Sequence, residues 1–530
     1  MSTKTTARLL TACVLLLTSA ACGDLTVEPR STVTSDNIFD DPSSYRLFLA
    51  KLYAGLVVSG QTGPHGDPDI LGIDEGFSQY IRGYWQLQEL PTDHAIIGWG
   101  DIGLPELNTQ LWSSSNPFIT AMYARIYYQV TLANEFLRQT TDEKLTSRGV
   151  DAQLRTEIQQ YRAEARFLRA LSYWHAVDLF GNVPLITEAF SLEAAARGEL
   201  PTQSTRTEVF NFVESELEAI RDQLPTRLNV QYGRASRSAA DMVLAKLFLN
   251  AQVYTGTARY SDARAAAEAV IAAGYSLDPN FRHIFTADNH ESPEIIFPIP
   301  QDGERTRTWG GLTYLIHASV GGSMNAGAYG IDGGWWGLRL RPETVDRYEG
   351  GAGGPDLRTS FFYTDGQQKT ISSVGNFNHG FAAPKFSNVT FEGQAGSHPT
   401  FPDTDFPMFR LADAYLIYAE AVVRGGGGSR ATALGYVNEL RRRAYGGPTG
   451  DITDAQLTLD FILDERSREL LWEAHRRQDL VRFDRFTDAG TWSWKGGIQV
   501  GRVTESYRDL YPIPATEIVA NPNIRQNTGY

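Results

Sequence analysis

Hydrophobic residues recur at helical spacing along most of the chain, and the longest such stretch covers residues 461–483. There Leu463, Leu470, Ala474 and Val481 follow one another at intervals of seven, four and seven residues. These intervals place the four side chains on one face of a helix. Neither Gly nor Pro interrupts the stretch. The pattern therefore predicts one continuous helix over residues 461–483.

The same stretch carries a column of acidic residues, Glu465, Glu469 and Glu473, spaced four apart. Like charges at this spacing destabilise a helix slightly, so compensating charges are needed. Basic residues that could supply them are Arg466, Arg468, Arg476 and Arg477, with Glu473 and Arg477 in the favourable order. A metal or catalytic site is the alternative to such an ionic network. We prefer the network, because carboxylate metal sites on helices usually include a His at matching spacing, and His475 lies on another face.

Other segments show the same helical periodicity. It predicts helices beginning near residues 42 and 117, and over residues 161–180, 207–224, 238–254, 261–273, 408–424 and 430–443. Segments 238–254 and 261–273 have about the length of one tetratricopeptide unit, and antiparallel helix pairs of this kind stack naturally. The apolar run at residues 294–299 predicts a short strand.

Two regions, residues 60–105 and 301–407, lack this periodicity and are rich in Gly and aromatic residues. Loops of such length are usually either functional or disordered. Disordered chain is poor in aromatic residues, so we expect residues 301–407 to form ordered loops.

Composition and charge narrow the possible functions. The net charge is −14, and no run of Lys and Arg is long enough to form a phosphate-binding stripe, which argues against nucleic acid as a partner. The only two cysteines are Cys13 and Cys22, and the nine His residues show no ligand spacing. The sequence therefore predicts no metal site and no cofactor.

The N-terminus has the features of a bacterial lipoprotein. Residues 1–21 read as a signal peptide, because the apolar stretch 9–21 is too short to cross a bilayer. Small residues precede Cys22, as in a lipobox, which makes Cys22 the expected lipidation site; residues 22–38 would form a tether. Ser19 stands where Leu is usual, so ordinary cleavage after Ala21 is the alternative.

Four stretches resemble one known family. They are residues 165–186 (ARFLRALSYWHAVDLFGNVPLI), 409–422 (FRLADAYLIYAEAV), 465–482 and 511–530 (YPIPATEIVANPNIRQNTGY). Together they resemble, in order, the motifs of the SusD/RagB family of nutrient-uptake lipoproteins. The resemblance spans nearly the whole mature chain.

The resemblance implies a mostly α fold. Tetratricopeptide-like helix pairs, forming an α-α superhelix, would pack against a less regular, loop-rich ligand-binding part with a few short strands. Residues 39–300 would form the N-terminal helical part and residues 301–530 the C-terminal part, within one globular unit. The implied function is binding without catalysis: capture of an oligosaccharide at the outer face of the outer membrane and delivery to a SusC-like TonB-dependent transporter.

Sugars present apolar C–H faces beside hydroxyl groups, so their sites need exposed aromatic side chains with polar neighbours. Two loops offer this chemistry, and the candidate ligand-binding residues are Trp99, Asp101, Trp335, Trp336, Tyr329 and Asp332. Alternatively, these Trp side chains pack inward, since Trp is usually well buried.

Enzyme motifs are weak. Residues 98–103 match GxGxxG, but the sequence around them shows no clear strand–turn–helix pattern, and Asp101 and the following Pro105 also argue against a dinucleotide site. A glycoside hydrolase needs only two carboxylates, for which Asp101 with Asp74 or Glu75 would be the candidates. The remaining alternatives are the same scaffold binding peptides or another nutrient, and a tetratricopeptide scaffold for protein partners.

Overall fold

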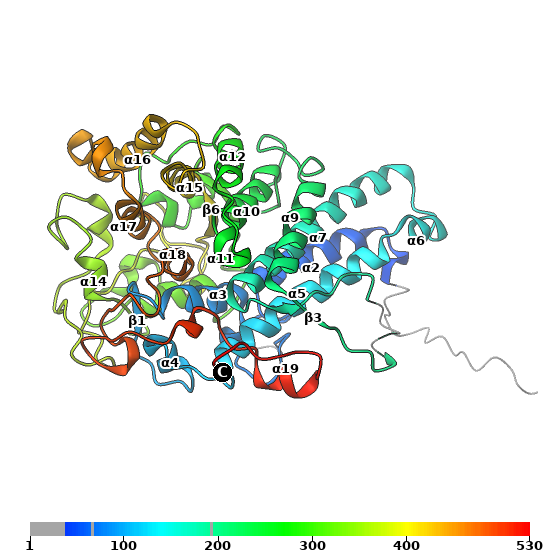
Figure 1. The fold of residues 1–530 in the computed structure, drawn as a ribbon, viewed down its shortest axis with the longest axis horizontal. Coiled ribbons are helices and arrows are strands. Elements are labelled where there is room, and N and C mark those ends of the chain that lie inside the picture. The colour runs from blue at the N-terminus through cyan, green and yellow to red at the C-terminus, as the bar shows by residue number, and fades with distance from the viewer. Residues whose placement is uncertain (1–37, 65–67, 191–193, 195) are drawn as a thin grey trace, which may run out of the picture. The chain divides into compact units, whose positions relative to one another are not determined.

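The computed structural model describes residues 38–64, 68–190, 194 and 196–530 (Figure 1). Cys22, the predicted signal peptide and nearly all of the predicted tether lie outside the described residues. Residues 45–530 cluster into a single unit, and the short 3-10 helix η1 (Ile38–Asp40) belongs to the segment before it.

Most regular structure is helical, as the sequence predicts. Seventeen α-helices occur within the described ranges: α2 (Ser43–Val57), α3 (Tyr80–Glu89), α4 (Leu104–Thr109), α5 (Pro117–Gln139), α6 (Asp142–Ser147), α7 (Ala152–Leu179), α9 (Arg206–Ile220), α10 (Arg237–Leu249), α11 (Ala251–Thr255), α12 (Tyr260–Ile271), α13 (Gly311–Ala318), α14 (Pro342–Val345), α15 (Leu411–Val423), α16 (Arg430–Ala444), α17 (Leu459–Glu469), α18 (Arg476–Arg482) and α19 (Ala515–Ala520).

The long helices form the expected layers. Helix α7 packs against α5 and α9, and α12 packs against α10 and α15, as Figure 1 shows for the upper and right-hand parts of the view. Helix α7 begins where the Asp151 side chain accepts a hydrogen bond from the Leu154 N–H, and its chain turns away at Gly181, whose φ is 74°.

The described residues form three two-stranded sheets, all of them antiparallel and short. They pair β1 (Ala95–Ile97) with β5 (Leu338–Leu340), β2 (Val183–Pro184) with β3 (Gln203–Ser204), and β4 (Ile295–Ile299) with β6 (Phe406–Arg410). Strand β4 confirms the predicted strand at residues 294–299. Its partner was predicted as the start of a helix, but residues 408–410 belong to β6 because they pair with β4.

A second predicted helix also divides. The segment predicted over residues 238–254 consists of α10 and α11, which meet at Asn250 (φ −95°, ψ 5°). The Asn250 side chain donates a hydrogen bond to the Lys246 carbonyl (2.8 Å) and so satisfies a backbone acceptor at the end of α10. The neighbouring pair α10 and α12 is otherwise as predicted.

The prediction of one continuous helix over residues 461–483 is wrong. The chain leaves the helical path after α17 and re-enters it at α18, with Trp472 (φ 61°) and Ala474 (φ 63°) in the left-handed region. Only about a few per cent of non-Gly residues adopt this region, because their Cβ atom then crowds the backbone.

Distant side chains satisfy the backbone of this break. Trp85 Nε1 donates to the Trp472 carbonyl (2.9 Å), and Lys385 Nζ donates to the Leu471 carbonyl (2.5 Å). The Ala474 N–H donates to the Glu89 carboxylate (2.9 Å). Buried backbone groups must find partners, and these tertiary hydrogen bonds replace those of a continuous helix.

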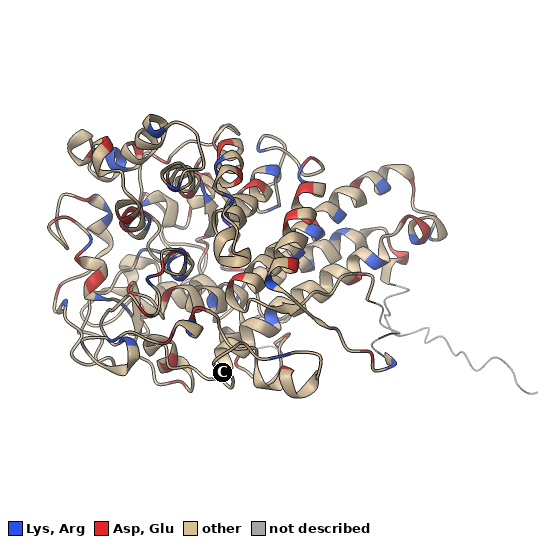
Figure 2. Cartoon of the chain, in the orientation of Figure 1, with Lys and Arg blue, Asp and Glu red and all other residues tan. Residues whose placement is uncertain are grey.

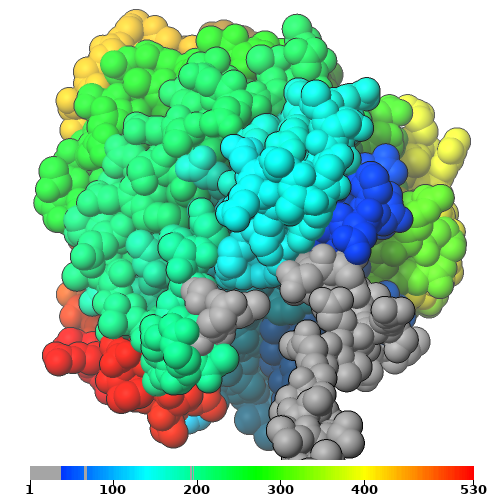
Figure 3. All heavy atoms as spheres, turned by 90° about the vertical axis from the view of Figure 1, so that its right-hand side faces the viewer, coloured from blue at the N-terminus to red at the C-terminus, as the bar shows by residue number. Residues whose placement is uncertain are grey.

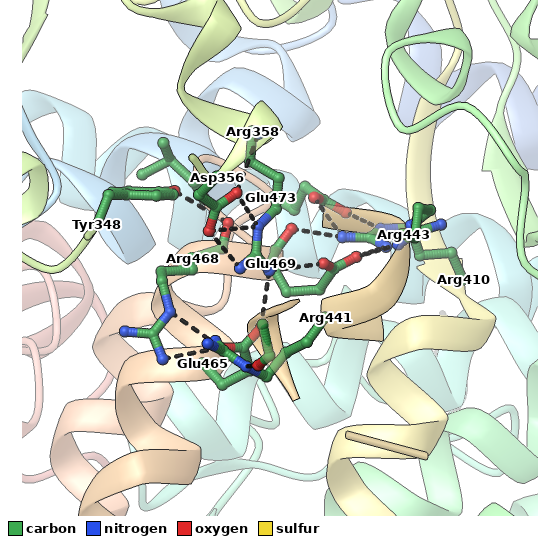
Figure 4. A network of polar contacts seen from close by, with 12 residues as sticks. Tyr348, Asp356, Arg358, Arg410, Arg441, Arg443, Glu465, Arg468, Glu469 and Glu473 are labelled. Carbon is green, nitrogen blue, oxygen red and sulfur yellow. Dashed lines mark hydrogen bonds and ion pairs between the residues drawn. The ribbon is translucent and has the colours of Figure 1, made fainter. Parts of the chain in front are cut away.

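The acidic column is a buried ionic network, drawn in Figure 4. Glu469 accepts from Arg358 (2.9 Å), Arg410 (2.8 Å) and Arg443. Its neighbours in the column are held in the same way: Glu465 pairs with Arg358, Arg441 and Arg468, and Glu473 with Arg410 and Lys385. All three glutamates are fully buried. No group of three metal-ligating side chains that could hold an ion occurs in the described part of the chain.

Most of the predicted compensating charges have other partners. Only Arg468 pairs within the column; Arg466 pairs with Asp413 (2.9 Å) and Arg476 with Asp93 (2.7 Å). Arg477 pairs with Asp178 (3.0 Å) and not with Glu473. Arg476 and Arg477 follow the break in the helix and lie in α18, away from the acidic column on α17.

Positive and negative side chains are mixed along the chain. Figure 2 shows Lys and Arg interspersed with Asp and Glu in the described ranges.

The C-terminal segment lies against the helical part. Figure 3 shows the C-terminal residues (red) beside residues near 200 (green), where the Gln203 side chain donates to the Arg525 carbonyl (3.0 Å). The tail is therefore docked by hydrogen bonds, which explains its turn-rich sequence.

Candidate functional site

The pairing of β1 with β5 brings two predicted ligand loops together. Because the strands are antiparallel, the end of β1 meets the start of β5, and the Gly98 N–H donates to the Gly337 carbonyl (3.0 Å). Trp99 follows β1, and Trp335 precedes β5. Trp99 Nε1 donates to the Trp335 carbonyl (3.0 Å), and the two rings lie 6.3 Å apart.

A third tryptophan extends this pair into a row. The Trp309 ring lies 6.1 Å from that of Trp335 and 5.1 Å from that of Phe401. Trp99, Trp335 and Trp309 are each half-buried, so one part of each ring is accessible while the rest packs on protein. We call these three side chains the aromatic row. Behind it, the His317 ring stacks on Trp335 at 4.6 Å.

Trp309 is the functional candidate that the sequence did not single out. Its only signal there is membership of the Gly- and aromatic-rich region 301–407. Its place depends on Glu75, whose carboxylate accepts from the Trp309 N–H (2.9 Å), and on Gly76, where a Cβ would press on the Trp309 backbone. These neighbours lie more than 200 residues earlier, so local pattern could not reveal the contact.

Arg82 lies beneath the row and is buried. Its guanidinium is 4.2 Å from the Tyr314 ring centroid, 4.4 Å from that of Phe77 and 6.0 Å from that of Trp99. Burial lowers the pKa of Arg82 to about 10, against the opposing influence of Tyr314, Asp74 and Asp101. One Nη atom donates to the Trp309 carbonyl (3.3 Å), while Nε and the other Nη contact no acceptor among the described residues.

Three carboxylates lie in the segments that carry or support the row. Asp101 is exposed on the Trp99 loop, and Asp74 is exposed beside Glu75. Glu75, by contrast, is buried and occupied, since it also accepts from the Ser59 hydroxyl (2.7 Å). Two carboxylate pairs were considered for a hydrolase, Asp101 with Asp74 and Asp101 with Glu75. The second pair would use a carboxylate that already stabilises the fold through its hydrogen bonds.

The GxGxxG match does not form a dinucleotide site. Strand β1 precedes it and α4 follows it, but β1 has three residues and pairs antiparallel. A dinucleotide fold places this motif in a parallel βαβ unit.

Trp336 and Asp332 lie near the row but not in it. Trp336 is 55% exposed, has a φ of 57°, and turns its ring toward Gly321 and Phe377 rather than Trp335. Asp332 is exposed and accepts from the Thr400 hydroxyl (2.5 Å).

Tyr329 lines a different cavity. Its side chain, half-buried, borders a pocket of about 170 Å³ that also includes Arg282 and Tyr363. The six residues predicted from the sequence thus fall into two places: Trp99, Asp101 and Trp335 at the aromatic row, with Trp336 and Asp332 beside it, and Tyr329 in this separate pocket.

Comparison with known proteins identifies the family. A sequence model described as "SusD family" matches residues 357–530, and one described as "Starch-binding associating with outer membrane" matches residues 86–249. The starch-binding protein SusD of Bacteroides thetaiotaomicron is 35% identical over the full length of both chains. The chain belongs to the SusD family.

More distant relatives share the SusD fold. SusD-like protein P2 of Formosa agariphila is 25% identical over 98% of each chain. The surface glycan-binding protein A of B. thetaiotaomicron, solved in complex with laminarihexaose, superposes with a TM-score of 0.69 at 21% identity, covering 91% of this chain and 98% of that one. A SusD homologue from B. thetaiotaomicron superposes with a TM-score of 0.72 at 20% identity, covering 94% and 99%.

Membership of the SusD family agrees with the four resembling stretches. Residues 165–186 lie within the second matched region, and residues 409–422, 465–482 and 511–530 lie within the first. No helix in the described ranges of this SusD-family chain is long and apolar enough to cross a membrane.

Proposed function

We propose that this protein is a cell-surface lipoprotein, anchored in the outer membrane through Cys22, that binds an oligosaccharide without catalysis and delivers it to a SusC-like TonB-dependent transporter. The aromatic row carries the proposal. Its three half-buried rings offer flat apolar faces to sugar C–H groups, and the carboxylates of the same segments offer hydrogen-bond acceptors to hydroxyl groups.

The relatives support this ligand class. The 35% identical relative is named for starch binding, and a structural neighbour was solved with laminarihexaose. Both ligands are neutral glucose polymers. We therefore expect a neutral glucan segment to lie along the row, with Trp99 and Trp335 stacking on successive sugar units.

The alternatives find less support in the site. Peptide binding by this scaffold would use a free strand edge or a charged pocket, and the row offers flat rings instead. A hydrolase built on Asp101 and Glu75 would need both carboxylates free, and Glu75 is committed to Ser59 and Trp309. The other pair, Asp101 and Asp74, is exposed, and release of reducing ends tests it.

Titration of the mature, unlipidated protein tests the proposal. Isothermal titration with malto-oligosaccharides, laminari-oligosaccharides and a peptide mixture should give saturable binding to one glucan class. Trp99→Ala and Trp335→Ala should each weaken it at least about tenfold, because stacked tryptophans dominate such interfaces.

Trp494→Ala is the matched control. Trp494 is also half-buried and donates from Nε1 to a carbonyl, that of Ile371 (2.8 Å), but its ring contacts no member of the row. It should leave the affinity unchanged. Equal affinities in all three variants would refute the assignment of the row, binding of peptides alone would replace the ligand class, and release of reducing ends would show catalysis.

A further inference from the structure

The pocket at Tyr329 differs in chemistry from the aromatic row. Its walls are aromatic: Phe361 and Phe362 are buried, and Tyr329 and Tyr363 are half-buried. The hydroxyl groups of Ser360 and Ser387 add polar atoms. Aromatic faces combined with a few hydroxyl groups suit a sugar ring, and a volume of about 170 Å³ admits one unit rather than a chain.

The charge of the pocket is the reverse of that along the row. Arg282 is exposed at its edge, and its guanidinium forms no ion pair or hydrogen bond with any described residue. None of the residues that line the pocket, all within the described ranges, is acidic. One carboxylate contacts a lining hydroxyl from outside the lining: the exposed Asp365 accepts a hydrogen bond from the Tyr363 hydroxyl (3.5 Å). In a chain of net charge −14, this is a locally positive cavity.

Lys385 adds rigidity rather than free charge. Although it also lines the pocket, its Nζ donates to the Glu473 carboxylate (2.6 Å) and the Leu471 carbonyl (2.5 Å). Its charge is therefore compensated, and the pocket is fixed to the buried ionic network of Figure 4. A site supported in this way is preorganised, which reduces the entropy lost on binding.

One loop touches both the pocket and Trp336, which lies beside the row. Gly321 lies against the Trp336 ring, and two residues later the Ser323 hydroxyl hydrogen-bonds with that of Tyr363 (2.9 Å). Two residues of chain span at most about 7 Å, so the Tyr363 side of the pocket lies close to Trp336.

We propose that this pocket is a second subsite, which binds a single sugar unit carrying an anionic group, a carboxylate or a sulfate, through Arg282 and the walls formed by Tyr329 and Tyr363. The inference rests on the proposed function in that it takes the ligand to be a glycan. It adds that the ligand carries acidic units, whereas the row selects neutral ones. Arg suits this role because its planar guanidinium pairs with carboxylate and sulfate oxygens in a bidentate manner.

Matched monosaccharides test the subsite directly. Methyl glucuronide and methyl glucoside differ by one carboxylate, and glucose 6-sulfate supplies the sulfate arm. Binding to the mature protein is measured by ligand-observed NMR at low and high salt. The two anionic sugars, or one of them, should bind at least about tenfold more tightly than the glucoside, and salt should weaken this preference.

Variants separate the subsite from the row. Arg282→Gln should remove the preference for the anionic sugar, Arg282→Lys should restore part of it, and Arg502→Gln, at an exposed arginine without an ion pair, should leave it intact. Trp335→Ala should weaken oligosaccharide binding without changing monosaccharide binding. Equal binding of all three sugars, no binding of any, or a preference that survives Arg282→Gln would overturn the subsite. A failure of the proposed function would appear separately, as Trp335→Ala without effect on oligosaccharides.

Discussion

Replacing Glu469 by Gln tests whether the buried network stabilises the fold by charge. Glu469 accepts hydrogen bonds from Arg358, Arg410 and Arg443 and is fully buried. Burial by itself would raise its pKa, but Arg443, Arg410 and Arg358 outweigh burial and lower the pKa from its usual 4.5 to about 2.

The size of the effect follows from this pKa. A lowering from 4.5 to about 2 corresponds to about 3 kcal/mol of differential stabilisation of the carboxylate, at about 1.4 kcal/mol per pH unit. Breaking a buried ion pair by removing one partner costs a similar amount, about 3–5 kcal/mol, since the remaining cations lose their compensation. We therefore expect Glu469→Gln to lower the free energy of unfolding by about 3 kcal/mol at pH 7.

The sign of the pH dependence is also determined. Since the pKa of Glu469 is lower in the folded state, its contribution is complete above about pH 4.5 and is lost as the pH falls toward about 2. The difference between wild type and Glu469→Gln should therefore shrink by more than half between pH 7 and pH 3.

Equilibrium urea unfolding, followed by both tryptophan fluorescence and circular dichroism, measures both quantities. Glu199→Gln is the control, because Glu199 and its partner Arg197 are both exposed and such a pair contributes at most about 1 kcal/mol. A Glu469→Gln deficit below about 1 kcal/mol at pH 7, or one that is equal at pH 7 and pH 3, would refute the electrostatic explanation.

Three further predictions concern buried features outside the network. Trp85→Phe removes the donor to the Trp472 carbonyl and should lower the free energy of unfolding by about 1–3 kcal/mol in the same urea assay; an unchanged value would mean that this hydrogen bond does not support the helix break. Ala474→Gly should raise it by about 0.5–1 kcal/mol, because Gly adopts the left-handed φ of 63° without strain from Cβ; a loss would show that the alanine methyl contributes more by packing. Burial raises the pKa of Asp405 to about 6, despite hydrogen bonds from Tyr232 and the Gln301 N–H. Stability should thus fall by up to about 3 kcal/mol as the pH rises from about 4 to 6 relative to Asp405→Asn, and parallel pH profiles of the two proteins would contradict this.

The helical content and the family could be predicted from the sequence because both depend on local pattern. The periodicity of residues 161–180 reports a buried face, and α7 (Ala152–Leu179) covers all but the last residue of that segment, although it begins earlier than predicted. The aromatic loops were also visible, since Trp99, Trp335 and Trp336 stand in Gly-rich segments. Nothing in the sequence of these segments indicates which loops contact one another in the folded protein.

The same periodicity led to the wrong prediction of one helix over residues 461–483, because the apolar spacing continues across the break between α17 and α18. Hydrophobic spacing reports which side chains are buried, and it holds for α17, the break and α18 alike, because all three lie in the core. The backbone path through Trp472 and Ala474 depends on Trp85, Glu89 and Lys385, which stand far away in the chain.

The sequence by itself thus determined a helical SusD-family protein and indicated aromatic loops as its candidate ligand-binding segments, because local spacing, motif order and residue type suffice for these conclusions. Only the tertiary structure decided that Trp309 joins Trp99 and Trp335, that Tyr329 faces a separate positive pocket, and which arginines compensate the acidic column. The physical reason is that ring contacts and buried ion pairs form between residues hundreds of positions apart, where no periodicity connects one partner to the other.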